Sequence, residues 1–169
     1  MAIFSPLRSR RMAQQPHAVT VPLIAFQLRQ IWFAVPMTAI VRVMPLGPIY
    51  GDPQHTGISV TRYDDQELTV VDVGHRIFSD PGALPAEVLD DATPATQSCL
   101  VVLQTRQGER IGLPIDSQPE VRRVPETQIV PLPETYRQHG NIHCISTLSV
   151  QAADQPPLFI LDPDQLRQQ

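Results

Sequence analysis

Two stretches, LIAFQLRQ at residues 23–30 and LVVLQTRQ at residues 100–107, repeat nearly the same phrase in separate halves of the chain. The residues after each copy also agree. Each copy leads through a turn into a strand that ends in an apolar-Pro-apolar sequence, at residues 35–37 in one half and 113–115 in the other. A Val-Arg strand closed by a proline comes next, and this proline is Pro45 in the first half and Pro125 in the second. The order of the elements therefore repeats, which indicates two similar supersecondary units.

The ends of the two halves are alike as well. Tyr63–Phe78 and Ala153–Gln169 each place a polar Asp-Gln turn before an apolar strand that ends in an aspartate, Asp72 or Asp162. A glycine, Gly57 or Gly140, precedes each of these final hairpins. The likeness thus covers residues 23–78 and 100–169, which is most of the chain.

Strands are the natural prediction for these units. Ile24, Phe26 and Leu28 fall on one face by the two-residue period of a strand, and residues 101, 103 and 105 do so in the copy. The Gln107-Gly108 pair predicts a tight hairpin turn. Repeated apolar strands separated by turn signals are typical of a small barrel or sandwich, and two barrels side by side would fill the length.

Composition supports a mostly β fold. The chain has 169 residues, 42% hydrophobic and 18% charged, and 18 prolines, which disfavour long helices. We predict that residues 79–97 form a linker between the halves and that residues 83–91 form two helical turns within it. Asp162 and Pro163 predict an N-cap and first position of a short terminal helix. We expect a flexible tail at residues 1–19 and a folded domain at 20–169.

Charge and apolar patterning limit the partners and the location. The net charge of -4 gives no electrostatic reason to expect nucleic acid or an anionic membrane as a partner. No apolar run is long enough for a signal peptide or a spanning helix, and the two cysteines do not make a disulfide framework. The sequence predicts a cytoplasmic protein without direct membrane insertion.

The sequence contains no recognisable constellation of catalytic residues. His143 and Cys144 would point to opposite faces of a strand, which disfavours a metal site with His139. The acidic pairs at residues 64–65 and 90–91 indicate solvated turns, and phosphate-binding and nucleophile motifs are missing from the sequence. We therefore predict a protein that is not an enzyme and has no catalytic residue, cofactor or metal.

Arg62 stands out as a candidate interface residue. It ends GISVTR, just before the acidic turn at residues 63–66, where an exposed guanidinium could anchor a protein partner. The alternative is a surface ion pair with Asp64 or Asp65, which contributes little. Both interpretations are open from the residues alone.

Several motifs together resemble a known family, the CheW-like domain of bacterial chemotaxis adaptors. They are IAFQL followed by WFAVPMTAIVRV, the Gly57-Ile58 pair, LTVVDV at residues 68–73, LVVLQTRQGERIGLPID at residues 100–116 and LFILDPDQL at residues 158–166. The likeness runs over about residues 20–168. Each motif is degenerate, and their order and spacing carry the resemblance.

The resemblance implies an all-β fold of two similar, intertwined, five-stranded SH3-like β-barrel subdomains with short helices. It implies a non-catalytic scaffold that couples a methyl-accepting chemoreceptor, through its cytoplasmic tip, to the regulatory domain of a CheA-type histidine kinase in chemotaxis, phototaxis or pilus motility. The different interpretation that stays open is a small β-barrel module that binds a ligand or nucleic acid outside signalling.

The chain also departs from the family pattern. Where members carry an Asn-Leu-Arg-Gly-like stretch, this chain has Val60-Thr61-Arg62-Tyr63 and keeps only the arginine, and Arg42 stands where a glutamate is common. The predicted protein-binding residues are Arg62, Ile58, Val60, Tyr63 and Arg42, with Ile58 and Val60 on the strand phase of Arg62 and Tyr63 at the turn. A core position is the commoner role for Ile58 and Val60.

Overall fold

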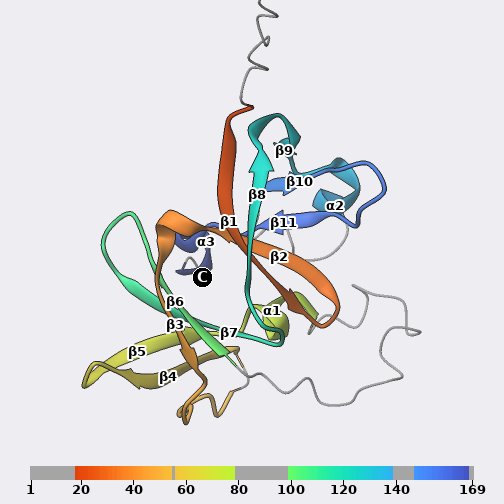
Figure 1. The fold of residues 1–169 in the computed structure, drawn as a ribbon. Helices are drawn as coiled ribbons and strands as arrows, with labels where there is room; N and C mark the ends of the chain where they lie inside the picture. The colour runs from red at the N-terminus through yellow and green to blue at the C-terminus, as the bar shows by residue number, and fades with distance from the viewer. Residues whose placement is uncertain (1–17, 55, 79–98, 139–146, 168–169) are drawn as a thin grey trace, which may run out of the picture.

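The computed structural model describes residues 18–54, 56–78, 99–138 and 147–167. Eleven strands dominate it (Figure 1), with three short α-helices and two 3-10 turns between them. In chain order the elements are β1 (Thr20–Leu28), β2 (Ile31–Pro36), η1 (Met37–Ala39), β3 (Ile40–Pro45), β4 (Ile58–Tyr63), β5 (Gln66–Val71), α1 (Val73–Phe78), β6 (Cys99–Gln104), β7 (Arg110–Ile115), β8 (Glu120–Pro125), η3 (Glu126–Gln128), β9 (Ile129–Pro131), α2 (Glu134–Gln138), β10 (Leu148–Val150), β11 (Leu158–Ile160) and α3 (Pro163–Arg167).

The doubled phrase forms two equivalent hairpins. LIAFQLRQ covers most of β1 and its turn into β2, and LVVLQTRQ covers β6 and the start of its turn into β7. Arg29 and Gln30 adopt positive φ in the first turn, and Gly108 adopts a φ of 85° in the second. The predicted Gln107-Gly108 hairpin is therefore confirmed, since a tight turn requires positive φ and glycine reaches it without strain.

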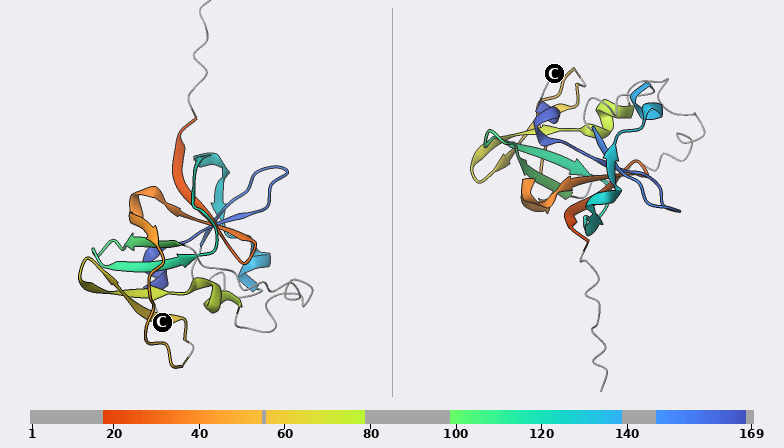
Figure 2. Two further views of the ribbon diagram at one scale, coloured as in Figure 1. Left: turned by 60° about the horizontal axis from the view of Figure 1, so that its bottom comes forward. Right: turned by 90° about the horizontal axis from the view of Figure 1, so that it is seen from above.

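The halves exchange strands. β3 of the first half pairs with β6 of the second, and β8 of the second half pairs with β1 of the first. β11 adds parallel to β2, and β5 adds parallel to β7. The two resulting sheets, ordered β8-β1-β2-β11-β10-β9 and β3-β6-β7-β5-β4, are each built from both halves. The predicted intertwined barrels are confirmed, and Figure 2 shows the two units side by side.

One barrel has an extra strand. The sheet of β3 has the five strands predicted, whereas the sheet of β1 has six because β9 pairs with β10. The counterpart of β9 in the other sheet is a single bridge between Tyr50 and Val60. Pro48 and the positive φ of Gly51 flank Tyr50, which keeps this segment from pairing further.

Three apolar clusters explain why the strands are rich in apolar residues on both faces. In β1, Phe26 and Leu28 enter a central core that also receives Val101 and Leu103 of β6, while Leu23 belongs to a second cluster inside its own barrel. The third cluster fills the other barrel and consists of Tyr63, Leu68, Val70, Leu100 and Val102. The central core thus joins the two barrels into one folded unit.

The two aspartates predicted at the strand ends have the same structural role, which is to cap a helix. Asp72 accepts a hydrogen bond from the His75 backbone N–H at 2.9 Å, and Asp162 accepts one from the Asp164 N–H at 3.0 Å. Each carboxylate caps the short helix that comes after it, α1 or α3. The predicted terminal helix is confirmed, whereas α1 was not predicted from the sequence.

Several sequence predictions lie outside the described residues. They concern the tail at 1–17, the linker with the helical turns expected over 83–91, the glycine at 140, the acidic pair at 90–91, and the histidines and cysteine at 139, 143 and 144. The division into a tail at 1–19 and a domain at 20–169 stays a prediction.

Candidate functional site

The predicted binding residues of β4 do not all share one side. Burial alternates along the strand, so Ile58, Val60 and Arg62 lie on the outer side, and Tyr63 lies on the inner side. Ile58 and Val60 are half-buried and belong to none of the three core clusters, so the core position expected as their commoner role is not confirmed. Their role in binding stays a prediction.

Tyr63 departs from its expected place beside Arg62. Its side chain is only 8% exposed, it packs in the barrel with Leu68 and Val70, and the Arg110 guanidinium lies 5.5 Å from its ring centroid. The tight turn begins one residue later, at Asp64 and Asp65, which both have positive φ. Because the strand alternation persists through Tyr63, its ring points into the barrel, and its role in binding stays a prediction.

Arg62 presents an exposed cation. Among the described residues its guanidinium forms no salt bridge, so the predicted alternative of an ion pair with Asp64 or Asp65 is not found there. Its cross-strand neighbour is Glu67 of β5. An exposed guanidinium of this kind is a suitable anchor for a carboxylate on another protein.

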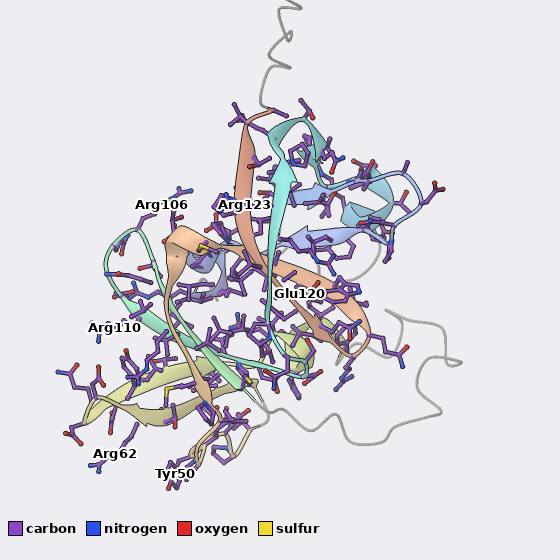
Figure 3. The ribbon with its side chains drawn as sticks, viewed as in Figure 1. Tyr50, Arg62, Arg106, Arg110, Glu120 and Arg123 are labelled. Carbon is purple, nitrogen blue, oxygen red and sulfur yellow. The ribbon has the colours of Figure 1, made fainter. Side chains whose placement is uncertain are left out.

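Tyr50 lies close to this position and was missed in the sequence. Its backbone exchanges two hydrogen bonds of 2.8 Å with Val60, and its side chain is 62% exposed. Figure 3 shows Tyr50 and Arg62 at the same end of the molecule, beside β4. Tyr and Arg are the residue types enriched at interface anchor points. The signal in the sequence was an aromatic residue between Pro48 and Gly51, in a segment too turn-rich to be core.

A groove runs beside this sheet and is lined by residues of its outer side and also by Tyr63 and Leu68, which pack inside the barrel. It has a volume of about 850 Å³ and lies between β4, β5, the tip of the β6–β7 hairpin and α3. Apolar side chains line it, with charged groups among them: Ile58, Leu68, Val71, Ile111 and Leu166, and Asp64, Glu67, Glu109, Arg110 and Arg167. An ion pair between Arg167 and Glu109 ties α3 to the hairpin. A mixed apolar and charged groove of this kind can receive an amphipathic helix.

Arg42 belongs to a different surface. It lies on β3, at the opposite edge of the same sheet from β4, and it is exposed between Val41 and Val43. It forms no salt bridge with any residue that the structure describes. The five predicted binding residues therefore divide into the outer side of β4, the inside of the barrel and the β3 edge.

The described residues offer neither a metal site nor a membrane-spanning helix. Within the described ranges, no three His, Cys, Asp or Glu side chains gather in a way that could hold a metal ion. No helix in these ranges is both long and apolar enough to span a bilayer. Asp64 and Asp65 are exposed in their turn, as the sequence predicted.

Comparison with known proteins identifies the family of this chain. The model of the CheW-like domain matches residues 22–169, nearly the whole chain. The chain belongs to the CheW-like domain family. The intertwined barrels of this CheW-like domain are similar to those in the crystal structure of the scaffolding protein TtCheW from Thermoanaerobacter tengcongensis. That structure matches with a TM-score of 0.65 and 16% sequence identity, over 89% of this chain and 90% of that chain. The comparison with curated proteins gives no match.

Proposed function

We propose that this CheW-like domain is a non-catalytic, cytoplasmic adaptor of bacterial signal transduction. In this role it couples the cytoplasmic tip of a methyl-accepting chemoreceptor to the regulatory domain of a CheA-type histidine kinase, in chemotaxis, phototaxis or pilus motility. The observation that carries the proposal is the family match over residues 22–169, together with the similarity of the fold to a scaffolding protein.

The geometry supports an adaptor because the exposed residues divide between separate surfaces. The groove beside β4 has the mixed apolar and charged lining that suits an amphipathic helical segment, and Arg62 and Tyr50 lie on the strand next to it. Arg42 lies on the opposite sheet edge. A molecule with two such surfaces can hold two proteins at once without any reacting group. We assign the groove and the β4 edge to the receptor tip.

The test is binding of the purified full chain to the host's kinase regulatory domain and to a receptor cytoplasmic fragment. Size-exclusion chromatography should give a co-eluting complex with each. Arg62→Glu should weaken receptor binding by about tenfold, because it replaces an anchoring cation with a repelling charge. Arg137→Glu, an equal charge change on α2, is the matched control and should leave receptor binding unchanged. The proposal is contradicted if the chain elutes separately from every kinase and receptor of the host when the proteins are mixed at concentrations of about tens of micromolar, where a weak adaptor contact would still form.

A further inference from the structure

One wall of the groove beside β4 is formed by the end of the β6–β7 hairpin, and the sheet ladder does not extend to this end. β5 and β7 pair at two positions, Thr69 with Ile111 and Val70 with Gly112, whereas the β4–β5 and β6–β7 hairpins each pair at six. The turns of both hairpins come before the short ladder, and the groove is lined by residues of both turns. We call residues 106–109 the hairpin tip. Contacts other than the ladder between β5 and β7 must therefore fix its position.

The helix α3 lies beside the hairpin tip and is itself anchored in the protein. Leu166 of α3 is fully buried in the central core. Its backbone carbonyl oxygen accepts a hydrogen bond of 2.9 Å from the Arg76 guanidinium of α1. A helix of five residues is too short to be stable alone, so these contacts and the Asp162 cap fix the position of α3. α3 can therefore support a neighbouring turn.

Two side chains of α3 contact the hairpin tip. Asp164 accepts a hydrogen bond of 3.0 Å from the backbone N–H of Arg106 and lies 3.3 Å from the Nε of the same residue. Arg167 forms an ion pair with Glu109. Because the Arg106 side chain is 86% exposed, its ion pair contributes little, and the bond from its backbone N–H is the stronger contact. The two side chains thus hold both ends of the tip, and Figure 3 shows Arg106 on this hairpin.

The position of the hairpin tip affects the shape of the groove. Glu109 and Arg110 of the hairpin line the groove together with Leu166 and Arg167 of α3. The Arg110 guanidinium also lies 5.5 Å from the ring centroid of Tyr63, a contact at the base of the hairpin tip that leaves residues further along the turn to α3. A shift of the tip away from α3 would therefore move one wall of the groove.

We propose that α3 is a clamp that holds the hairpin tip in the position that suits the helix of the receptor tip, with Asp164 and Arg167 as positioning residues. This inference rests on the proposed function, because it concerns the groove assigned to the receptor. A helix binds only the fraction of molecules whose groove has the fitting shape, so its affinity falls in proportion to that fraction when the clamp is released.

Exchange of the charges of Arg167 and Glu109 tests the clamp. The full chain is titrated with a cytoplasmic fragment of the host's receptor, and calorimetry measures Kd. Arg167→Glu and Glu109→Arg each bring like charges together and should each raise Kd by about fivefold. The double variant carries an attractive pair again and should return Kd to within about twofold of wild type.

Two controls separate the clamp from a change of net charge. Arg137→Glu breaks an exposed ion pair with Glu134 on α2 and should leave Kd within about twofold of wild type. Arg137→Glu combined with Glu109→Arg restores the net charge but not the clamp, so this pair should bind as weakly as Glu109→Arg alone. The side chains changed are each more than a third exposed, so circular dichroism should show folded variants.

Amide hydrogen exchange measures the clamp in the free chain. The backbone N–H of Arg106 donates to Asp164, so its exchange reports whether the tip stays against α3. It should exchange about fivefold faster in Arg167→Glu and in Glu109→Arg, and at the wild-type rate in the double variant.

The outcomes separate this inference from the proposed function. If the wild type binds no receptor fragment, the proposed function falls and the role of the clamp in binding falls with it. If the wild type binds and the single variants bind equally well, only the clamp is refuted. The clamp is also refuted if the double variant stays weak, since Arg167 and Glu109 would then contact the receptor directly, or if Kd changes while exchange at Arg106 does not.

Discussion

Cutting the chain between its halves tests the exchange of strands most directly. Separate pieces that end and begin within residues 79–98 would each contain one copy of the sequence repeat. Because β8 pairs with β1 and β3 pairs with β6, neither piece contains a complete sheet. We expect each piece alone to be unfolded and an equal mixture of the two to fold.

The expected loss of stability comes from the central core. Phe26, Leu28, Phe33 and Val35 of the first half are at most 1% exposed, and they pack against residues of the second half. Burial of each such side chain contributes about 1.5–3 kcal/mol, so four of them contribute roughly 6–12 kcal/mol. A domain has a total stability of only about 5–15 kcal/mol, so the loss would leave a piece without a stable fold.

Circular dichroism and thermal melting of each piece measure this loss, followed by size-exclusion chromatography of the mixture. The mixture should melt cooperatively and elute as a one-to-one complex. The uncut chain is the control. A cooperative melt from either piece alone would mean that a half folds as an independent barrel, and the exchanged strands would then not be needed for folding.

Three smaller changes test individual features. Asp162→Ala removes the cap of α3 and should cost about 1 kcal/mol, a fall of about 2–4 °C in Tm, whereas Asp162→Asn should keep most of the stability. Ser149→Ala removes a buried hydroxyl that lacks a hydrogen-bond partner among the described residues. The free energy of unfolding in urea should therefore stay unchanged or rise by up to about 1 kcal/mol. A fall of more than about 1 kcal/mol would mean that the hydroxyl has a hydrogen-bond partner. Gly57→Ala should destabilise by about 1–2 kcal/mol, because φ is 77° and the new Cβ would lie 3.2 Å from the Asp72 carbonyl oxygen. Gly51→Ala, at a φ of 80° in open space, is its control, and an equal loss there would assign the whole effect to backbone strain.

The candidate site was predictable only in part. Arg62 is exposed on its strand, in phase with Ile58 and Val60, as the two-residue period of the sequence indicated. The same period, continued one residue further, would have placed Tyr63 inside, but the acidic turn was expected to begin earlier. Tyr50 escaped notice because a lone aromatic residue in a turn-rich segment has no periodicity to mark it.

Charge pairing was not visible in the sequence either. The Val-Arg strands β3 and β8 have similar sequences, but their arginines have different surroundings. Arg122 stacks on Trp32 and forms an ion pair with Glu120. Arg42 forms no ion pair with an acidic residue among the described residues. Trp32 of β2 reaches Arg122 of β8 across β1, the strand between them in the sheet. Arg122 is thus engaged both by Glu120, two residues away, and by Trp32, which is distant in the chain.

The repeated order of strands, the Gly108 turn and the Asp162 cap could all be predicted from the amino acids alone, because each depends on residues within a few positions of one another. Only the tertiary structure shows that β3 pairs with β6 of the other half and that β8 pairs with β1 of the first half. The same holds for α1, which forms a helix against the central core. Side-chain period and turn chemistry act locally, whereas strand partners are selected by how apolar faces from the whole chain are buried together.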